Sequence, residues 1–424
     1  MQLPPLPPAA SVDLSKIEFW MRPLEEREAA FAALRRERPV CFQQEFVPPP
    51  GLGLPRGPGY YALSRHAEIV EVSRKPELYG SGRGTNIPDL PEAFNEFFGS
   101  MINMDDPRHG RLRRIVSRGF TPRALGRLEA DVERRAKQTL DRVIDKGACD
   151  FVAEIAAPLP LEIICDLMGI PESQTRYVFD QTNVILGLGD PEYVPEAANV
   201  IAAALGAGKA LADLMYDLAK RRQGARADDF TSALLEADVE GGALTHQELA
   251  SFFVLLVVAG NETTRNAISH GMLALCDHPD ERRKWVADFE AVAPTAIEEI
   301  VRWSSPVIHF RRTVTRDTEL AGQKLRAGEK VVMWYNSGNR DEAAFADPFR
   351  FDVTRKPNEH VGFGGPGPHH CLGANLARRE IRVLFRELFR RLPDLEITGP
   401  PERLRSNFIH GIKRMPCAWT KRAA

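Results

Sequence analysis

FGGPGPHHCLG, residues 363–373, is the stretch of this chain that decides its fold. A loop of glycine and proline delivers one cysteine, Cys371, to LGANLARREIRVLFRELFRRL, which has the pattern of an amphipathic helix ending before Pro393. Backbone N–H groups at the start of a helix stabilise an anion and lower the pKa of a thiol. The stretch therefore predicts a thiolate at a helix N-terminus, which is what an iron ligand requires.

Other interpretations of this loop are weaker. A phosphate-binding loop would need a Gly-Lys-Ser/Thr ending, which is absent. The consecutive residues His369, His370 and Cys371 cannot easily point at one zinc ion, and a structural zinc site needs four ligands. A buried, inert thiol is the ordinary interpretation of an isolated cysteine, but the Gly/Pro loop at a helix start favours a ligand here.

Residues 245–276 predict a long buried helix. Thr245 and Glu248 have capping-box spacing, and the apolar stretch that follows continues without proline to Leu275. At its centre stands AGNETT, residues 259–264, in which Ala259 and Thr263 share one face. Polar groups there are costly unless they are partnered or functional. For Thr263, a hydroxyl bonded back to a helix carbonyl is the ordinary alternative.

Two charged pairs stand at helical spacing. Glu299 and Arg302 are three residues apart, and such a pair is usually a weak surface ion pair. His109 and Arg113 are four residues apart and would present two cationic or donor groups on one face.

Together these elements resemble the cytochrome P450 family. The loop is similar to the family signature F-G-x-G-x-H-x-C-x-G, with Phe363 one residue farther from the cysteine than usual, and AGNETT to the oxygen-binding motif [AG]-G-x-[DE]-T-[TS]. Glu299 and Arg302 match the family's E-x-x-R. The motifs follow the family's order over nearly the whole chain. The resemblance implies a mainly α fold, a triangular helical domain with small peripheral β-sheets. We expect one domain over residues 1–424, with residues 1–15 as a loose arm.

The resemblance also implies a role for each site residue. Cys371 would be the axial ligand of the iron of haem b, and Glu262 and Thr263 would deliver protons to bound O2. The expected cofactor contacts are His109, Arg113, Ala259, Gly260, Arg312, Phe363, His369 and Gly373. Glu299, Arg302 and Arg355 would form a buried network that supports the cysteine loop.

The implied activity is O2- and NAD(P)H-dependent hydroxylation of an apolar lipid. Residues 256–270, 293–312 and 408–413 resemble the actinobacterial branch that hydroxylates terminal methyl groups of methyl-branched and isoprenoid lipids. Neighbouring members attack the side chain of cholesterol-type steroids. The expected substrate contacts are Val258, Ala259, Val307 and Phe408, for which ordinary core packing is the alternative. A haem sensor and a peroxide-driven peroxygenase remain alternative functions, but neither requires the acid–alcohol pair.

Composition narrows the class of protein. The chain has 58 acidic and 56 basic residues and a formal net charge of −2, so no general affinity for polyanions follows. Its six cysteines include no C-x-x-C, which argues against a disulfide framework or zinc ribbon and favours a reducing cytoplasm. The first residues do not have the pattern of a signal peptide, and the longest apolar run, residues 252–260, is about half the roughly 20 residues of a bilayer span.

Electrons are expected from a ferredoxin and its NAD(P)H-dependent reductase, since no flavin or iron–sulfur module is visible in the chain. A local basic cluster in this nearly neutral chain suggests where the ferredoxin docks. It consists of Arg108, Arg111, Arg114 and Lys356.

Overall fold

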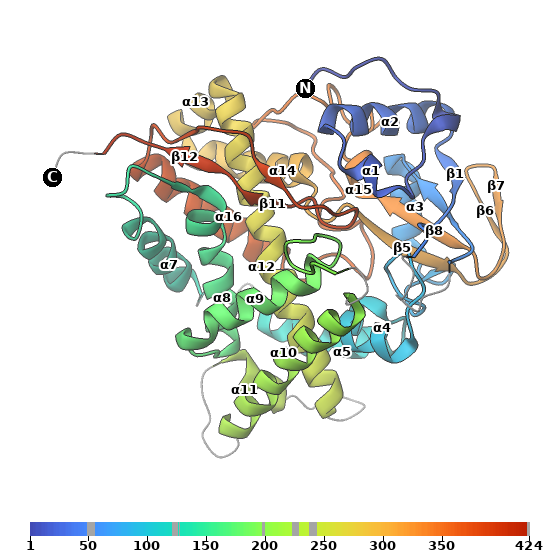
Figure 1. The fold of residues 1–424 in the computed structure, drawn as a ribbon, viewed down its shortest axis with the longest axis horizontal. Helices are drawn as coiled ribbons and strands as arrows, with labels where there is room; N and C mark the ends of the chain where they lie inside the picture. The colour runs from blue at the N-terminus through green and yellow to red at the C-terminus, as the bar shows by residue number, and fades with distance from the viewer. Residues whose placement is uncertain are drawn as a thin grey trace.

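The computed structural model describes residues 1–48, 56–120, 126, 128–196, 200–222, 229–236 and 244–421. Helices dominate, and small sheets lie at the periphery (Figure 1). The helices are α1 Ile17–Trp20, α2 Leu24–Glu37, α3 His66–Arg74, α4 Glu92–Gly99, α5 Arg108–Ser117, α7 Glu129–Asp141, α8 Pro158–Met168, α9 Thr175–Leu186, α10 Val200–Arg222, α11 Phe230–Leu235, α12 His246–Asp277, α13 Pro279–Ala287, α14 Phe289–Ser304, α15 Tyr335–Gly338 and α16 Ala374–Arg391. A π-helical turn covers Val152–Ala156.

The largest sheet joins strands from both ends of the chain, in the order β1-β2-β8-β5-β3. Only the β2–β8 pair among its neighbours is parallel. Its strands are β1 Val40–Gln43, β2 Tyr60–Leu63, β3 Tyr79–Gly80, β5 His309–Val314 and β8 Lys330–Trp334. The smaller sheets pair β6 Thr318–Leu320 with β7 Gln323–Leu325, β10 Glu402–Arg403 with β11 Ile412–Arg414, and β12 Pro416–Ala418 with both β4 Ala148–Asp150 and β9 Glu396–Ile397.

Helix α12 is the central element, crossing the molecule between the α10–α11 region and α13 (Figure 1). The predicted capping box is present, since Glu248 N–H donates to the Thr245 hydroxyl and Thr245 N–H donates to the Glu248 carboxylate. Most of its 32 residues are buried in one large apolar cluster with α8, α14 and α16. Burial on nearly all sides explains why its sequence is apolar all round rather than on one stripe.

The expectation of a loose N-terminal arm is wrong. Ala9 and Leu14 are each only 1% exposed and pack into the cluster that contains Trp20 and Trp334. The Trp20 indole donates to the Leu14 carbonyl at 3.0 Å and stacks on Trp334. We expected a loose arm because the first residues are rich in proline. The few apolar side chains of this arm instead pack on one face of the large sheet.

Among the described residues, no helix combines the length and apolar character needed to cross a membrane.

Candidate functional site

The loop before α16 holds Cys371 by backbone contacts. Cys371 N–H donates to the Phe363 carbonyl at 2.9 Å. Gly367 has a φ of 151°, and a Cβ there would lie 2.2 Å from the Ser73 carbonyl oxygen of α3. Only glycine tolerates this approach and this conformation. The loop is therefore pressed against α3, with Cys371 placed two residues before Gly373, the N-cap of α16.

The thiol of Cys371 faces opposing influences. Burial raises its pKa, whereas the backbone N–H groups of Gly373 and Ala374 and the charges of Arg113 and Arg378 lower it. Although protein atoms surround the thiol, Cys371 as a whole residue is exposed. A Cβ built on Gly373, two residues farther along, would meet no atom within 4 Å. Cys371 is thus an exposed residue whose thiol lies near groups that favour its anion.

Phe363 lies beside this cysteine and belongs to the same loop. Its ring carries the Arg378 guanidinium at 4.5 Å and approaches His370 with a centroid distance of 6.3 Å. The extra residue in the loop therefore keeps Phe363 next to the cysteine, with one face committed to Arg378.

Helix α12 has one open patch in its buried length, the Ala259 face, made of Ala259, Gly260 and Thr263. Ala259 is exposed and the other two are partly exposed, while the neighbouring residues Glu262 and Thr264 are buried. The Thr263 hydroxyl donates to the Ala259 carbonyl at 2.8 Å. This is the back-bonded geometry named above as the alternative, and it leaves the hydroxyl oxygen free to accept a hydrogen bond at the Ala259 face.

Gly260 has a packing reason to be glycine. A Cβ there would come within 2.9 Å of the Ile164 side chain on α8. The close approach of α8 accounts for the missing side chain, so the sequence pattern alone does not make Gly260 a cofactor contact.

The Glu262 carboxylate is held inside the protein by neighbouring side chains. Glu262 is 1% exposed, forms an ion pair with Arg265 and accepts from Asn266 at 3.1 Å. Arg265 in turn donates to Asn183 of α9 at 3.2 Å. Glu262 Oε2 has no hydrogen-bond partner among the described residues. The sequence analysis missed Arg265 and Asn266, although their spacing of three and four residues from Glu262 was a usable signal.

The four predicted anion contacts come together from three segments: α5 carries His109 and Arg113, β5 carries Arg312, and the cysteine loop carries His369. The rings of His109 and His369 lie 4.1 Å apart between centroids, and Arg113 donates to the His370 carbonyl at 2.6 Å. Arg312 and Arg113 both lower the pKa of His369, although burial has the largest effect and brings it to about 2.

Two polar groups among these four residues lack a full set of partners within the described part of the chain, although His109 Nδ1 lies 3.6 Å from the Asp106 carboxylate. Arg312 is 5% exposed and forms no ion pair with any described residue. The Nε2 atom of His109 is buried without a hydrogen-bond partner in the same part of the chain. A carboxylate group placed here would satisfy both.

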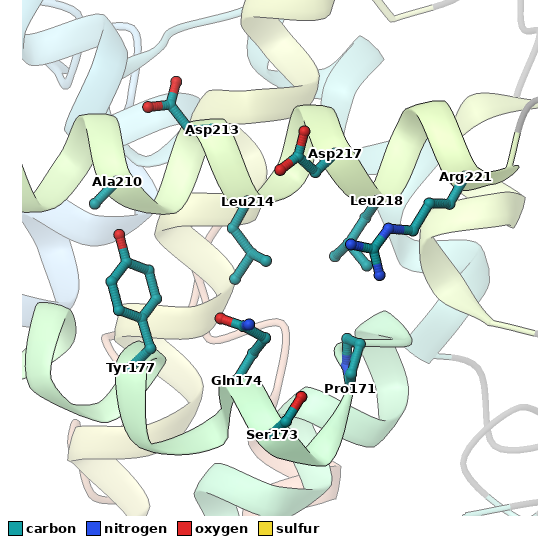
Figure 2. Close-up of a pocket in the computed structure, with 10 residues that line it drawn as sticks. All are labelled: Pro171, Ser173, Gln174, Tyr177, Ala210, Asp213, Leu214, Asp217, Leu218 and Arg221. Carbon is teal, nitrogen blue, oxygen red and sulfur yellow. The ribbon is translucent and has the colours of Figure 1, made fainter.

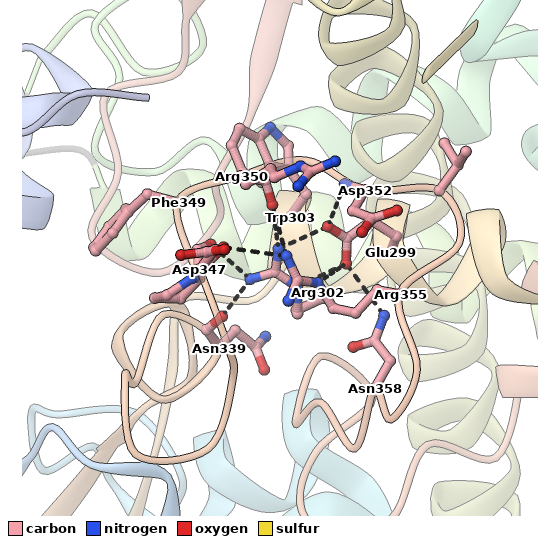
Figure 3. Close-up of polar contacts among 12 residues, drawn as sticks. Glu299, Arg302, Trp303, Asn339, Asp347, Phe349, Arg350, Asp352, Arg355 and Asn358 are labelled. Carbon is pink, nitrogen blue, oxygen red and sulfur yellow. Dashed lines mark hydrogen bonds and ion pairs between the residues drawn. The ribbon is translucent and has the colours of Figure 1, made fainter. Parts of the chain in front are cut away.

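The Glu299–Arg302–Arg355 network is buried, and Figure 3 shows its polar contacts. Arg302 donates twice to Glu299, each time at 2.8 Å, and Arg355 donates to the same carboxylate at 3.1 Å. The remaining guanidinium N–H groups bind backbone carbonyls of the irregular segment before the cysteine loop. These carbonyls belong to Asn339, Ala346, Asp347, Pro348 and Arg350. The network therefore organises a segment that has no helix or strand of its own.

The expected substrate contacts form two groups. Phe408 packs edge-on against Phe310 at 5.6 Å, and its carbonyl accepts from Ile308, directly after Val307. Val258 is 8% exposed and precedes the Ala259 face on α12. Val307 and Phe408 thus lie on adjoining segments, while Val258 and Ala259 share a helix.

Two of the four residues in the basic cluster form local ion pairs. Arg108 pairs with Glu96, and Arg111 pairs with Glu248 at 3.2 Å. Arg114 and Lys356 are exposed.

A groove between α9 and α10 lies apart from all of these residues (Figure 2). Tyr177 and Gln174 face Leu214 across it, and Arg221 covers one end. None of the predicted site residues lines this groove.

Known proteins resemble this chain along nearly its whole length. The profile described as "Cytochrome P450" matches residues 207–402. A "Methyl-branched lipid omega-hydroxylase" of Mycobacterium tuberculosis is 50% identical over 421 residues, covering 98% of this chain and 96% of that protein. A "Steroid C26-monooxygenase" of Rhodococcus jostii is 42% identical, covering 90% of this chain and 80% of that protein.

Among solved structures, a Mycobacterium marinum cytochrome P450 in complex with pseudoionone superimposes with a TM-score of 0.91. It is 42% identical and covers 99% of this chain and 100% of its own.

Proposed function

Because this chain belongs to the cytochrome P450 family and is a haem-dependent monooxygenase, we propose that it hydroxylates the terminal carbon of methyl-branched or isoprenoid lipids. The observation that carries the proposal is the 50% identity, over 98% of the chain, to a methyl-branched lipid omega-hydroxylase. The steroid C26-monooxygenase relative supports a second substrate, a sterol side chain, which also ends in a branched methyl pair.

The described residues fit a haem. Cys371 is exposed, and the group His109, Arg113, Arg312 and His369 has two open places among the described residues: Arg312 forms no ion pair, and His109 Nε2 is buried without a hydrogen-bond partner. A haem propionate fits such a place. Those residues would hold haem b, and the iron would supply activation of O2 and insertion of one oxygen atom into a C–H bond. As the ligand of that iron, the Cys371 thiolate would donate electron density that favours O–O cleavage.

The protein's own part is to place a proton and a substrate. At the Ala259 face, the small side chain leaves room for a diatomic ligand. The Thr263 hydroxyl donates to the Ala259 carbonyl, so its oxygen stays free to accept a hydrogen bond there. Glu262 would exchange protons with this hydroxyl through water after leaving its ion pair with Arg265.

Terminal hydroxylation requires the pocket to exclude weaker C–H bonds. Internal and tertiary positions are easier to oxidise, so the terminal methyl must be held near the iron by shape. One methyl-sized misfit is worth only about 1–3 kcal/mol in an apolar pocket, so several contacts must act together. We assign them to Val258, Ala259, Val307 and Phe408.

Electrons come from a redox partner, which we propose is a ferredoxin served by an NAD(P)H-dependent reductase in the cytoplasm. The exposed side chains of Arg114 and Lys356 support an acidic partner.

The test is to incubate the reconstituted enzyme with branched and straight lipids of equal length and to locate the new hydroxyl group by mass spectrometry. We expect a preference for the branched lipid and a terminal hydroxyl. Preference for the straight chain, or hydroxylation mainly at internal carbons, would refute the proposal.

A further inference from the structure

Two cysteines that play no part in the proposed haem site face each other in the small sheet β4-β12-β9. Cys149 of β4 and Cys417 of β12 are direct partners in the antiparallel register. Their Sγ atoms lie 3.7 Å apart, and the Cys417 thiol lies 3.4 Å from the Cys149 carbonyl, to which it donates. Directly opposed residues in antiparallel strands have Cα atoms about 4.5–5.5 Å apart, which lies within the usual range for a disulfide, about 4.4–6.8 Å.

The environments of the two thiols differ. Cys417 is 1% exposed, whereas Cys149 is half-buried at the strand that follows α7. An oxidant can therefore reach Cys149, while Cys417 is held beside it and shielded from solvent. All six cysteines lie among the described residues. Of these six, Cys149 and Cys417 are the only two whose sulfur atoms lie within hydrogen-bonding distance of each other.

We propose that Cys149 and Cys417 are a modification site, a thiol pair that hydrogen peroxide converts reversibly into a cross-strand disulfide. The Cys149 thiolate attacks one peroxide oxygen, the O–O bond breaks, and Cys149 becomes a sulfenic acid with release of hydroxide. The Cys417 thiol then attacks the Cys149 sulfur, the S–O bond breaks, and water leaves. In sum, two thiols and one peroxide give one disulfide and two waters, so two electrons pass from sulfur to oxygen.

The local chemistry makes this reaction slow and dependent on pH. The hydrogen bond with Cys417, burial and the neighbouring carboxylates of Glu154 and Asp150 all raise the pKa of Cys149. Only the thiolate is nucleophilic, so little of the reactive form exists near neutral pH. The rate should rise roughly 10-fold per pH unit across the neutral range.

The bond would tie together distant parts of the chain. Strand β4 lies between α7 and α8, whereas β12 lies near the C-terminus and also pairs with β9, which follows α16. Oxidation would thus join the segment between α7 and α8 covalently to the segment that follows α16, without a new contact at the haem site.

The experiment treats the haem-loaded, full-length protein with hydrogen peroxide at pH 7.0 and 8.5, removes the peroxide with catalase and alkylates the remaining thiols. Peptide mass spectrometry without reductant should find the Cys149 and Cys417 peptides joined within one chain, with a mass lower by two hydrogens. Dithiothreitol should restore both thiols. Diamide, a thiol oxidant, should produce the same link.

Two variants make the result specific. Cys149→Ser, at the half-buried position, should abolish the link, and Cys276→Ser, also half-buried, should leave it unchanged. The oxidised parent protein should melt at a higher temperature than the reduced one, and Cys149→Ser should show no such shift.

Three results would overturn the proposal. They are a sulfinic acid at Cys149 beside a free Cys417, a Cys149 link between two chains on a non-reducing gel, and no oxidation of either thiol by peroxide or diamide at pH 8.5. None of these results depends on the lipid that the enzyme hydroxylates.

Discussion

At the scale of single residues, Thr263 and Glu262 are adjacent in sequence but sit in different environments. Thr263 lies at the Ala259 face, while Glu262 is buried in an ion pair with Arg265. The two residues are therefore not equally ready to take part in proton transfer. Thr263 is in place, and Glu262 must first exchange its partner, so the two residues should respond differently to substitution.

Replacing Thr263 with alanine should leave haem binding intact but uncouple electron use from product formation. The variant loses the hydroxyl oxygen at the Ala259 face, and a positioned proton-transfer group is typically worth about 10²–10⁴-fold in rate. The measurement is product formed per NADPH oxidised, together with released hydrogen peroxide. Thr264→Ala, at the buried neighbour, is the matched control and should keep the parent ratio. An unchanged ratio in Thr263→Ala would contradict the assignment.

Replacing Arg265 with leucine should destabilise the fold. The Glu262 carboxylate would remain buried without its cation, and breaking one side of a buried ion pair typically costs about 3–5 kcal/mol. The double variant Glu262→Gln/Arg265→Leu should recover part of this loss, because it removes the stranded charge. Thermal unfolding of the two single variants and the double variant measures the coupling. Additive losses would show that the pair is not coupled.

His270 makes stability depend on acid. Burial, and to a smaller extent Arg403, lowers its pKa to about 3, whereas an unfolded histidine titrates near pH 6.5. As pH falls, the unfolded state binds the proton first. The stability that neutral His270 contributes is therefore complete above about pH 6.5 and is lost progressively as the pH falls toward 3. Between pH 6.5 and 5 the loss is about 2 kcal/mol.

The variant His270→Gln checks this expectation. Glutamine keeps a donor for the His410 carbonyl, which now accepts from His270 at 3.0 Å, but it does not titrate. Chemical unfolding at pH 7 and pH 5 should show a flatter pH dependence for this variant. His246→Gln, at an exposed position on the same helix, should behave as the parent. Equal pH slopes for His270→Gln and the parent would rule out His270 as the source.

At the scale of elements, α16 is held on both sides by ion pairs. Its arginines reach carboxylates on α7 and α14, so the helix that follows Cys371 is fixed between two others. The pairs are Arg379–Glu129, Arg386–Glu133 and Arg391–Asp141 toward α7, and Arg378–Glu298 and Arg382–Glu290 toward α14. Exposed pairs of this kind contribute little individually, so they orient α16 more than they stabilise it.

The buried network of α14 should behave very differently from its exposed pairs. Glu299→Gln leaves Arg302 and Arg355 without a counter-charge in a fully buried site and should cost about 3–5 kcal/mol. We expect most of the protein to lose its haem or to aggregate, measured as haem bound per chain after purification. Glu290→Gln, in an exposed pair on the same helix, should cost less than about 1 kcal/mol. Similar haem content in both variants would contradict this role.

The sequence predicted elements better than it predicted contacts. Residues 245–276 predicted one helix, and α12 runs His246–Asp277, because a capping box and a continuous apolar stretch are local signals. Strand β4, within the mostly helical middle of the chain, was missed, because its three residues are extended only through pairing with β12.

The candidate site shows the same limit. The motif around Ala259 lies on the part of α12 that carries the Ala259 face, and the spacing of Arg265 from Glu262 is a local signal. The hydrogen bond from Arg265 to Asn183 of α9, some eighty positions away, depends instead on how α9 packs. The burial of Ala9, Val12 and Leu14 likewise depends on a sheet assembled from distant strands. Side-chain orientation at these places is decided by tertiary packing, to which sequence periodicity is blind.

At the scale of the whole molecule, electron delivery should be sensitive to salt. If an acidic ferredoxin docks through Arg114 and Lys356, reduction should slow as ionic strength rises, because the Debye length shrinks from about 10 Å at 0.1 M to about 3 Å at 1 M. Arg114→Gln/Lys356→Gln should slow reduction at low salt and reduce its salt dependence. Arg108→Gln should have a smaller effect, because Arg108 is already paired with Glu96. Stopped-flow reduction rates that do not change with ionic strength would contradict docking of the ferredoxin at this surface.

The strand order of the large sheet determines how late during synthesis the β2–β8 pair can form. Strand β2, near residue 60, lies beside β8, which begins at Lys330, so the ribosome must finish most of the chain before the central pair can form. At about 5–20 residues per second, that interval is on the order of 13–50 s. Throughout it, the nascent β2 exposes unpaired backbone groups that other chains can join. A polypeptide released before β8 is made should therefore aggregate, and slower translation should lengthen its dependence on chaperones.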